Sequence, residues 1–125
     1  YITSGGVDEI FQNSDFKVLY IRILAEKSEW LTLLEQADTL EQKLYADVIY
    51  QVTLARYRLG FIEDAYLNYI KPNNQHSYKY WHLISEIALL VDDIELAIHC
   101  YKGMISIYPN NDSSANWSKL NILKA

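Results

Sequence analysis

The sequence predicts an all-α fold built from helical hairpins, and three observations support this. Apolar residues recur at steps of three and four over residues 78–91 and again over 94–108, which places each set on one helical face. Only Val91, Asp92 and Asp93 separate the two segments, so the helices must fold back on each other. The four Gly and two Pro are fewer than a turn-rich β fold uses. One hairpin cannot bury both of its apolar faces, so we expect neighbours of the same kind.

The hairpin over residues 78–111 carries the most specific pattern. Its apolar positions are Trp81, Ile84, Ile87, Ala88 and Val91, then Ile94, Ala97, Ile98, Tyr101, Met104, Ile105 and Tyr108, up to a stop at Pro109. Trp81, Ile84 and Ser85 stand where the tetratricopeptide repeat has Trp, Leu and Gly, and Ala97-x3-Tyr101 and Pro109 resemble its A-x3-F and closing Pro. Ala88 departs from the expected Tyr, and Asp92 replaces a common turn Gly. The resemblance implies a right-handed α-solenoid that binds other proteins.

Residues 1–12 are polar and contain Gly, and we interpret them as an N-terminal tail. A degenerate repeat is predicted over residues 13–43, with Asn13 or Ser14 capping its first helix and Ser28 its second. The apolar residues of this repeat are Phe16, Val18, Leu19, Ile21, Ile23, Leu24 and Ala25, then Trp30, Leu31, Leu33, Leu34 and Ala37. Leu31 or Leu33 has to fill the position of a small residue, which makes the repeat degenerate.

A clearer repeat is predicted over residues 44–77, after a crossing at 39–43. Its first helix ends at Leu59-Gly60, because Gly adopts the left-handed conformation without penalty. Ala65 lies 32 residues before Ala97, against about 34 residues in the tetratricopeptide family. Pro72 cannot continue a helix, so the second helix is expected to end early at residues 71–74.

Residues 112–125 form one more amphipathic segment, with Asp112 or Ser113 as its cap. Its apolar residues are Ala115, Trp117, Leu120, Ile122 and Leu123. A repeat array needs a terminal helix over its last apolar face, so we predict a capping helix, the alternative being the first helix of a further repeat. Residues 1–125 are thus predicted to form one domain of about three hairpins and a cap.

Charge and composition argue against several kinds of partner. The net charge of −5 disfavours nucleic acid and anionic membranes, which select basic surfaces. No apolar run approaches the roughly 18 residues of a membrane span. The single Cys100 forms no internal disulfide and is expected to be a packed thiol. The compartment stays open, with the cytoplasm favoured. Because Tyr1 is neither an initiator Met nor part of a signal peptide, we expect a processed product or an excised module.

The sequence holds no recognisable catalytic, cofactor or metal motif. The only histidines are His76, His82 and His99, and no HExxH, CxxC, GxGxxG or GxSxG pattern occurs. The acidic pairs at 63–64 and 92–93 precede or begin helices, where carboxylates stabilise the helix start. We therefore predict a protein that is not an enzyme and needs no cofactor.

The resemblance implies a concave groove lined by the first helix of each hairpin. Its predicted residues are Phe16, Tyr20, Tyr50, Leu54, Tyr57, Arg58, His82 and Glu86, together with Leu89 and Leu90. Leu54, Leu89 and Leu90 have the alternative of packing between hairpins. His82 and Glu86 replace the basic clamp that some family members use for an acidic C-terminus. We therefore predict a ligand with an apolar or aromatic anchor.

Two functions of different classes remain open. The first is an adaptor, scaffold or chaperone-like module that binds a segment of another protein in this groove. The second is a structural solenoid subunit of a larger assembly, or an accessory module of a larger protein. Trp30, Trp117 and the apolar terminal segments would then support self-association.

Overall fold

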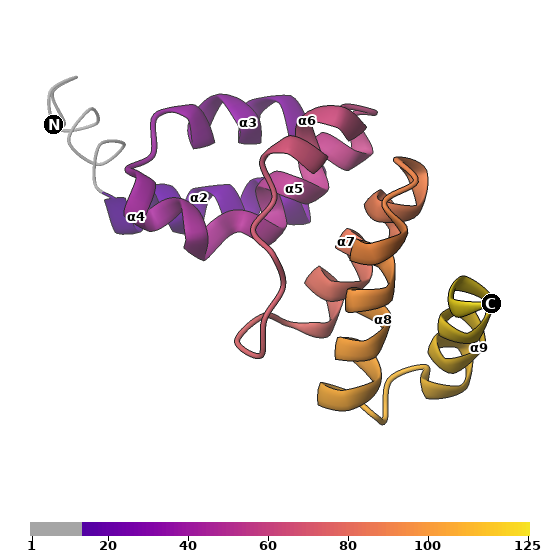
Figure 1. The fold of residues 1–125 in the computed structure, drawn as a ribbon. Coiled ribbons are helices and arrows are strands. Elements are labelled where there is room, and N and C mark those ends of the chain that lie inside the picture. Colours follow the sequence, from indigo (N-terminus) through magenta and orange to yellow (C-terminus); the bar gives the residue numbers. More distant parts are fainter. Residues whose placement is uncertain (1–13) are drawn as a thin grey trace, which may run out of the picture. The chain divides into compact units, whose positions relative to one another are not determined.

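The computed structural model describes residues 14–125, and these residues form helices joined by turns and loops (Figure 1). No strand occurs in this part of the chain, so the predicted all-α class is confirmed for it. The tail predicted over residues 1–12 and the cap predicted at Asn13 lie outside the described residues.

In chain order the elements are α2 (Ser14–Glu26), α3 (Trp30–Asp38), α4 (Gln42–Tyr45), the 3₁₀ helix η1 (Ala46–Val48), α5 (Ile49–Arg58), α6 (Ile62–Leu67), α7 (Tyr78–Leu90), α8 (Ile94–Ile107) and α9 (Ser113–Lys124). The chain divides between Phe61 and Ile62 into two compact units. Helices α2 to α5 belong to the first unit, and α6 to α9 belong to the second. The division falls between the two helices of the repeat predicted over residues 44–77.

The first unit is built around α3, which packs against both α2 and α5. Its buried core comes from α2, α3, η1 and α5 and consists of Ile21, Leu24, Leu33, Ala37, Val48, Val52 and Ala55. Lys17 on α2 donates a hydrogen bond to Thr39 at 3.0 Å, and Arg22 donates one to the carbonyl of Asp47 at 3.2 Å. Residues 39–41 of the crossing predicted over 39–43 join α3 to α4, and α4 and η1 lead directly into α5.

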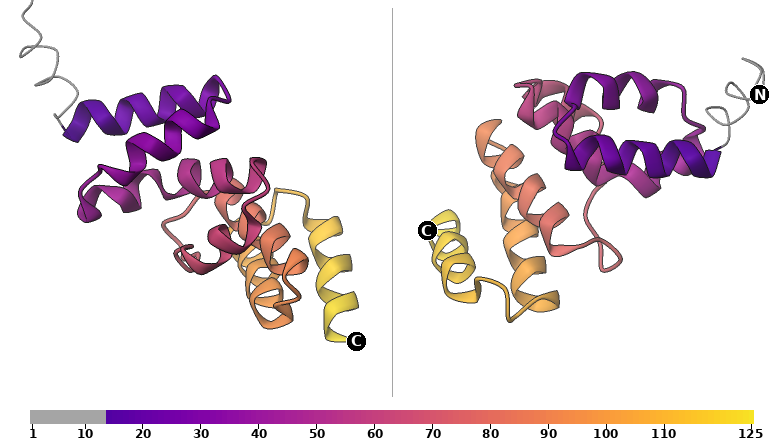
Figure 2. Two further views of the ribbon diagram at one scale, coloured as in Figure 1. Left: turned by 90° about the horizontal axis from the view of Figure 1, so that it is seen from above. Right: turned by 180° about the vertical axis from the view of Figure 1, so that it is seen from behind.

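In the second unit α7 and α8 form an antiparallel hairpin, and α9 packs on α8 (Figure 2). The buried residues of α7, a helix of 13 residues, are Tyr80, Trp81, Leu83, Ile84, Ser85, Ile87 and Ala88. Gly103 lets the two helices approach closely, because a Cβ atom placed there would stand 2.1 Å from Cζ3 of the Trp81 ring. The predicted hairpin of residues 78–111 is therefore present, and a small residue of α8 is fitted to its Trp.

The loop between α6 and α7 is held by side chains of α7 and α8. The Tyr80 hydroxyl accepts from the Ile70 amide at 2.9 Å and donates to the Ile70 carbonyl at 2.5 Å. Trp81 Nε1 donates to the Asn73 carbonyl at 3.1 Å, and the Tyr108 hydroxyl donates to the His76 carbonyl. Helix α6 ends at Leu67, before residues 71–74, where the sequence predicted its end. The backbone of the loop bonds to these side chains instead of extending the helix.

Helices α2, α5 and α7 end in the same kind of turn. Ser28, Gly60 and Asp92 adopt the left-handed conformation, with φ of 58°, 83° and 60°. In each turn the next amide bonds back to a carbonyl of the last helical turn, which is the Schellman arrangement. These bonds run from Glu29 to Leu24 at 2.9 Å, from Phe61 to Arg56 at 2.8 Å and from Asp93 to Ala88 at 2.9 Å. The prediction that Ser28 caps the second helix is wrong, because Ser28 forms this turn and Glu29 precedes α3.

The three turns recur at an interval of 32 residues, at positions 28, 60 and 92. The helices before them begin at the same interval, at residues 14, 46 (counting η1 with α5) and 78. The helices after them begin at residues 30, 62 and 94. The described chain thus holds three copies of one local pattern, a helix, a left-handed turn and a second helix. The interval noted between Ala65 and Ala97 therefore extends back to Leu33.

Candidate functional site

The first unit carries six of the residues predicted to line a groove. Phe16 and Tyr20 on α2 are half-buried, and their rings stack with centroids 6.2 Å apart. Tyr50, Leu54 and Tyr57 on α5 are half-buried, and Arg58 is exposed. Burial raises the pKa of the Tyr50 phenol, and the positive charge of Arg58 opposes that rise.

The second unit carries the predicted residues of α7. His82 Nδ1 lies 3.7 Å from Glu86 Oε1, one helical turn away, and the His82 ring lies 6.1 Å from that of Tyr78. Leu89 and Leu90 follow, with exposed fractions of 36% and 60%. The alternative in which Leu54, Leu89 and Leu90 pack between hairpins stays a prediction. That the residues of both units form one groove stays a prediction.

The interval of 32 residues changes which α2 residues match the rest of the predicted groove. His82 and Glu86 correspond to Tyr50 and Leu54 on α5, and then to Val18 and Arg22 on α2. Phe16 and Tyr20 correspond instead to positions that are buried in both later helices. Those positions are Val48 and Val52, then Tyr80 and Ile84. Counting back 32 residues from Tyr50 and Leu54 would have predicted Val18 and Arg22 as the α2 residues of the groove.

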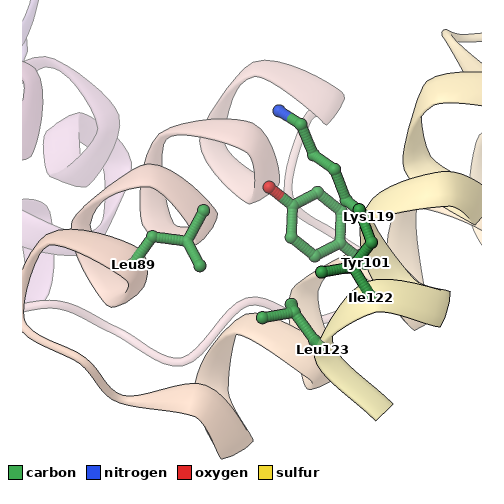
Figure 3. A pocket seen from close by; sticks show the side chains of 5 residues that line it. All are labelled: Leu89, Tyr101, Lys119, Ile122 and Leu123. Carbon is green, nitrogen blue, oxygen red and sulfur yellow. The ribbon is translucent and has the colours of Figure 1, made fainter. Parts of the chain in front are cut away.

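A hollow of about 160 Å³ opens next to Leu89, between the C-terminal halves of α7 and α9. Its lining residues are Leu89, Tyr101, Lys119, Ile122 and Leu123. Figure 3 shows Leu89 facing the Tyr101 ring from one side, with Ile122 and Leu123 on the α9 side. An engineered apolar cavity of ~150 Å³ holds a benzene molecule, so this hollow has room for one large apolar side chain.

Two polar groups border the otherwise apolar hollow. The Lys119 ammonium lies 5.8 Å from the centre of the Tyr101 ring, within cation–π distance. Lys119 makes no ion pair within residues 14–125. The Tyr101 side chain is 1% exposed, and its hydroxyl forms no hydrogen bond with a described residue. The site therefore combines an apolar interior with one hydroxyl and one positive charge.

At the other end, α7 and α9 are joined by polar contacts. Asn116 Nδ2 on α9 donates to the Tyr78 hydroxyl at 3.3 Å and to the Asn111 carbonyl at 3.1 Å. The Tyr78 hydroxyl also donates to Asp112 at 3.4 Å. These bonds hold the N-terminal ends of α7 and α9 together, while their C-terminal halves border the hollow. Asn116 is 3% exposed, so its side chain is committed to these structural contacts.

The described residues offer little for catalysis or membrane insertion. In residues 14–125 no three His, Cys, Asp or Glu side chains are grouped so that they could hold a metal ion. Burial raises the pKa of the Cys100 thiol to about 12, which disfavours the reactive thiolate. Within the same residues, none of the helices has the length and apolar character needed to cross a bilayer.

Of the five residues that line the hollow, the sequence predicted only Leu89 as a binding residue. Tyr101 was assigned to the core, and Lys119, Ile122 and Leu123 were considered only as parts of a cap. The helical periodicity of α9 does not reveal that Lys119, Ile122 and Leu123 lie near the C-terminal end of α7. Searches for similar proteins returned no matching family model, curated protein or solved structure.

Proposed function

We propose that this chain is a non-enzymatic protein–protein interaction module, an adaptor, scaffold or chaperone-like domain. In this proposal the three helix–turn–helix copies form a right-handed α-solenoid of the tetratricopeptide type, closed by α9. The interval of 32 residues in turns and helix starts supports a repeat of this kind, because such arrays use one supersecondary unit many times. The predicted groove residues on α5 and α7 would contribute to the same binding face.

The proposed role of α9 as a cap rests on its two faces. Asn116 and Leu120 are buried, and α9 packs on α8 while Asn116 bonds to Tyr78 of α7. The middle of the opposite strip consists of Ser114, Ser118 and Asn121, which are all exposed, and the exposed apolar Trp117 and Ile122 lie at its two edges. A polar outer face is what a terminal helix of a repeat array needs, whereas α7 is buried over most of its surface. A further repeat packed on α9 would require an apolar strip in that place.

The observation that carries the binding role is the hollow between α7 and α9. Leu89 is 36% exposed and Ile122 is 73% exposed beside it, so an apolar surface is open to solvent. A ligand with a large apolar or aromatic side chain would bury this surface, which is favourable by about 25 cal/mol per Å². The ligand class is a segment of another protein, because one side-chain pocket on a helical surface is a common peptide-recognition feature.

A displayed library of random peptides tests the proposal without a known partner. We expect the protein to enrich peptides that share one aromatic or large aliphatic residue. The substitution Leu89→Lys should abolish this enrichment, because it places a second ammonium group beside Lys119. Leu67→Lys is the matched control, since Leu67 is 69% exposed and lies outside the hollow. Equal enrichment by both variants would contradict the proposed site.

The second candidate function is a structural subunit that associates with copies of itself. The specific observation in its favour is that Trp117 and Ile122 on α9 are 50% and 73% exposed. Trp30, the other residue predicted for this role, is half-buried against the core of the first unit. Light scattering over a range of concentrations separates the two functions. A mass that rises with concentration, and that Trp117→Ser returns to the monomer value, would favour self-association.

A further inference from the structure

Tyr101 and Tyr80 are the buried tyrosines among the described residues of the second unit, and they differ in the bonding of the hydroxyl. The hydroxyls of Tyr80 and Tyr108 bond to loop carbonyls, and that of Tyr66 donates to Asp93 at 2.6 Å. The Tyr101 hydroxyl bonds to no described residue, and its oxygen is open to solvent although the residue as a whole is 1% exposed. Such a hydroxyl can bond to a ligand without breaking a bond within the described chain. Figure 3 shows its oxygen pointing into the hollow, on the side of Leu89.

We propose that the Tyr101 hydroxyl is the specificity-determining group of this hollow. It donates a hydrogen bond to a main-chain carbonyl of a partner segment whose aromatic or large aliphatic side chain fills the space. This inference rests on the proposed function and names the chemistry of its ligand. An apolar side chain and the carbonyl of the same residue lie only a few bonds apart, so one residue can supply both groups. A ligand that fills the hollow shuts the hydroxyl off from water, so a ligand carbonyl that accepts its hydrogen bond avoids the cost of an unpaired buried polar group.

The charges near the hollow are of opposite sign and exposed, so a neutral carbonyl competes with a carboxylate as the ligand group. Lys119 is the one charged residue in the lining. Glu86 lies on α7 one turn before Leu89, with His82 one turn further. The Glu86 side chain is 39% exposed and Lys119 is exposed, so solvent screens both charges and their opposite signs give a carboxylate little advantage. Lys119 can donate to a further carbonyl of the same segment, which gives the ligand a preferred direction.

Two small probes measure the contribution of the hydroxyl. N-acetylphenylalanine methylamide carries both the ring and the carbonyl, whereas toluene carries the ring alone. Backbone amide shifts in two-dimensional NMR report binding of each probe to the wild-type protein and to Tyr101→Phe. We expect the affinity of the amide probe to fall about three- to tenfold in Tyr101→Phe, as for one lost hydrogen bond, and that of toluene to stay the same.

The folding stability of the same variants separates binding from structure. Tyr101→Phe should keep the melting temperature, because its hydroxyl has no partner in the free protein. Tyr80→Phe should lower it, because two backbone groups of Ile70 lose their partner. Equal loss of affinity for toluene and the amide, or no loss for either, would overturn the role of the hydroxyl and leave the apolar site standing. No shift with any probe would overturn the site itself. If free N-acetylphenylalanine bound more tightly than its methylamide, the group recognised by the hollow would be a carboxylate and not a neutral carbonyl.

Discussion

The hairpins α2–α3 and α7–α8 share a backbone pattern but differ at the point where their helices meet. In α7–α8 the buried residues Ser85 and Ala97 are small, whereas the matching positions in α2–α3 hold Ile21 and Leu33. All four side chains have an exposed fraction of 0%. The interaxial distance of packed helices depends on the side chains at the contact. The hairpin pattern therefore tolerates both sizes, and the feature that the copies share is the left-handed turn.

We expect the largest effect on the free energy of unfolding when the large buried residue of one hairpin and the small buried residue of the other are exchanged. Leu33→Ala should lower the free energy of unfolding by about 2–5 kcal/mol, because it leaves a cavity in the first unit. Ala97→Leu should lower it by about 1–3 kcal/mol, because the added atoms have no space between α7 and α8. Urea denaturation measures both changes. Leu31→Ala is the control, since Leu31 is 62% exposed and should have little effect. A stabilised Leu33→Ala variant would show that a small residue is preferred in every copy.

Gly103→Ala tests how closely α7 and α8 approach. The new methyl group would overlap Trp81, whose ring packs 5.3 Å from that of His99 and whose nitrogen bonds to Asn73. Because the ring is held from several sides, we expect a loss of about 1–3 kcal/mol in urea denaturation. Ser106→Ala, an exposed position on the same helix, is the control. If Gly103→Ala were neutral or stabilising, as Gly to Ala in an open helix is, the close fit to Trp81 would be contradicted.

Much of this comparison could be predicted from the sequence, but the geometry of the contacts could not. Helical periodicity and the stop at Pro109 were sufficient to predict the α7–α8 hairpin. The turn at Ser28 was missed because Ser is a common helix cap and seldom left-handed, so its identity pointed to the wrong role. The end of α6 was also missed, because the Tyr80 hydroxyl that holds Ile70 belongs to another helix. The hollow depends on the packing of α9, which no local pattern encodes.

Acid should weaken the second unit but not the first. The described residues of the first unit contain no His, whereas His76 in the second accepts a hydrogen bond from the Asn73 amide at 3.0 Å. Burial lowers the pKa of His76 below its usual 6.5, so folding disfavours its protonated form. The unfolded state then binds more protons, and stability is lost as the pH falls below about 6.5.

Hydrogen exchange of α7 and α8 amides between pH 7.5 and 5, corrected for the intrinsic rate, measures this loss. We expect protection there to fall more than in α2 and α3. His76→Gln should remove the pH dependence, because Gln keeps an acceptor but does not titrate. An unchanged profile in that variant would assign the effect to other groups.

The smallest expected effects concern the three left-handed turns, the feature that both hairpins share. A left-handed non-Gly residue costs about 1–2 kcal/mol, and Gly adds about 0.4–1 kcal/mol of unfolded-state entropy. Ser28→Gly and Asp92→Gly should therefore each stabilise the protein by less than about 1 kcal/mol, whereas Gly60→Ala should destabilise it by a similar amount. Thermal unfolding of the three single variants measures their stabilities relative to the wild-type protein. If Ser28→Gly or Asp92→Gly destabilised the protein, the side chain at that turn would contribute more than the strain of its backbone. The turns would then differ between the hairpins as their helix contacts do.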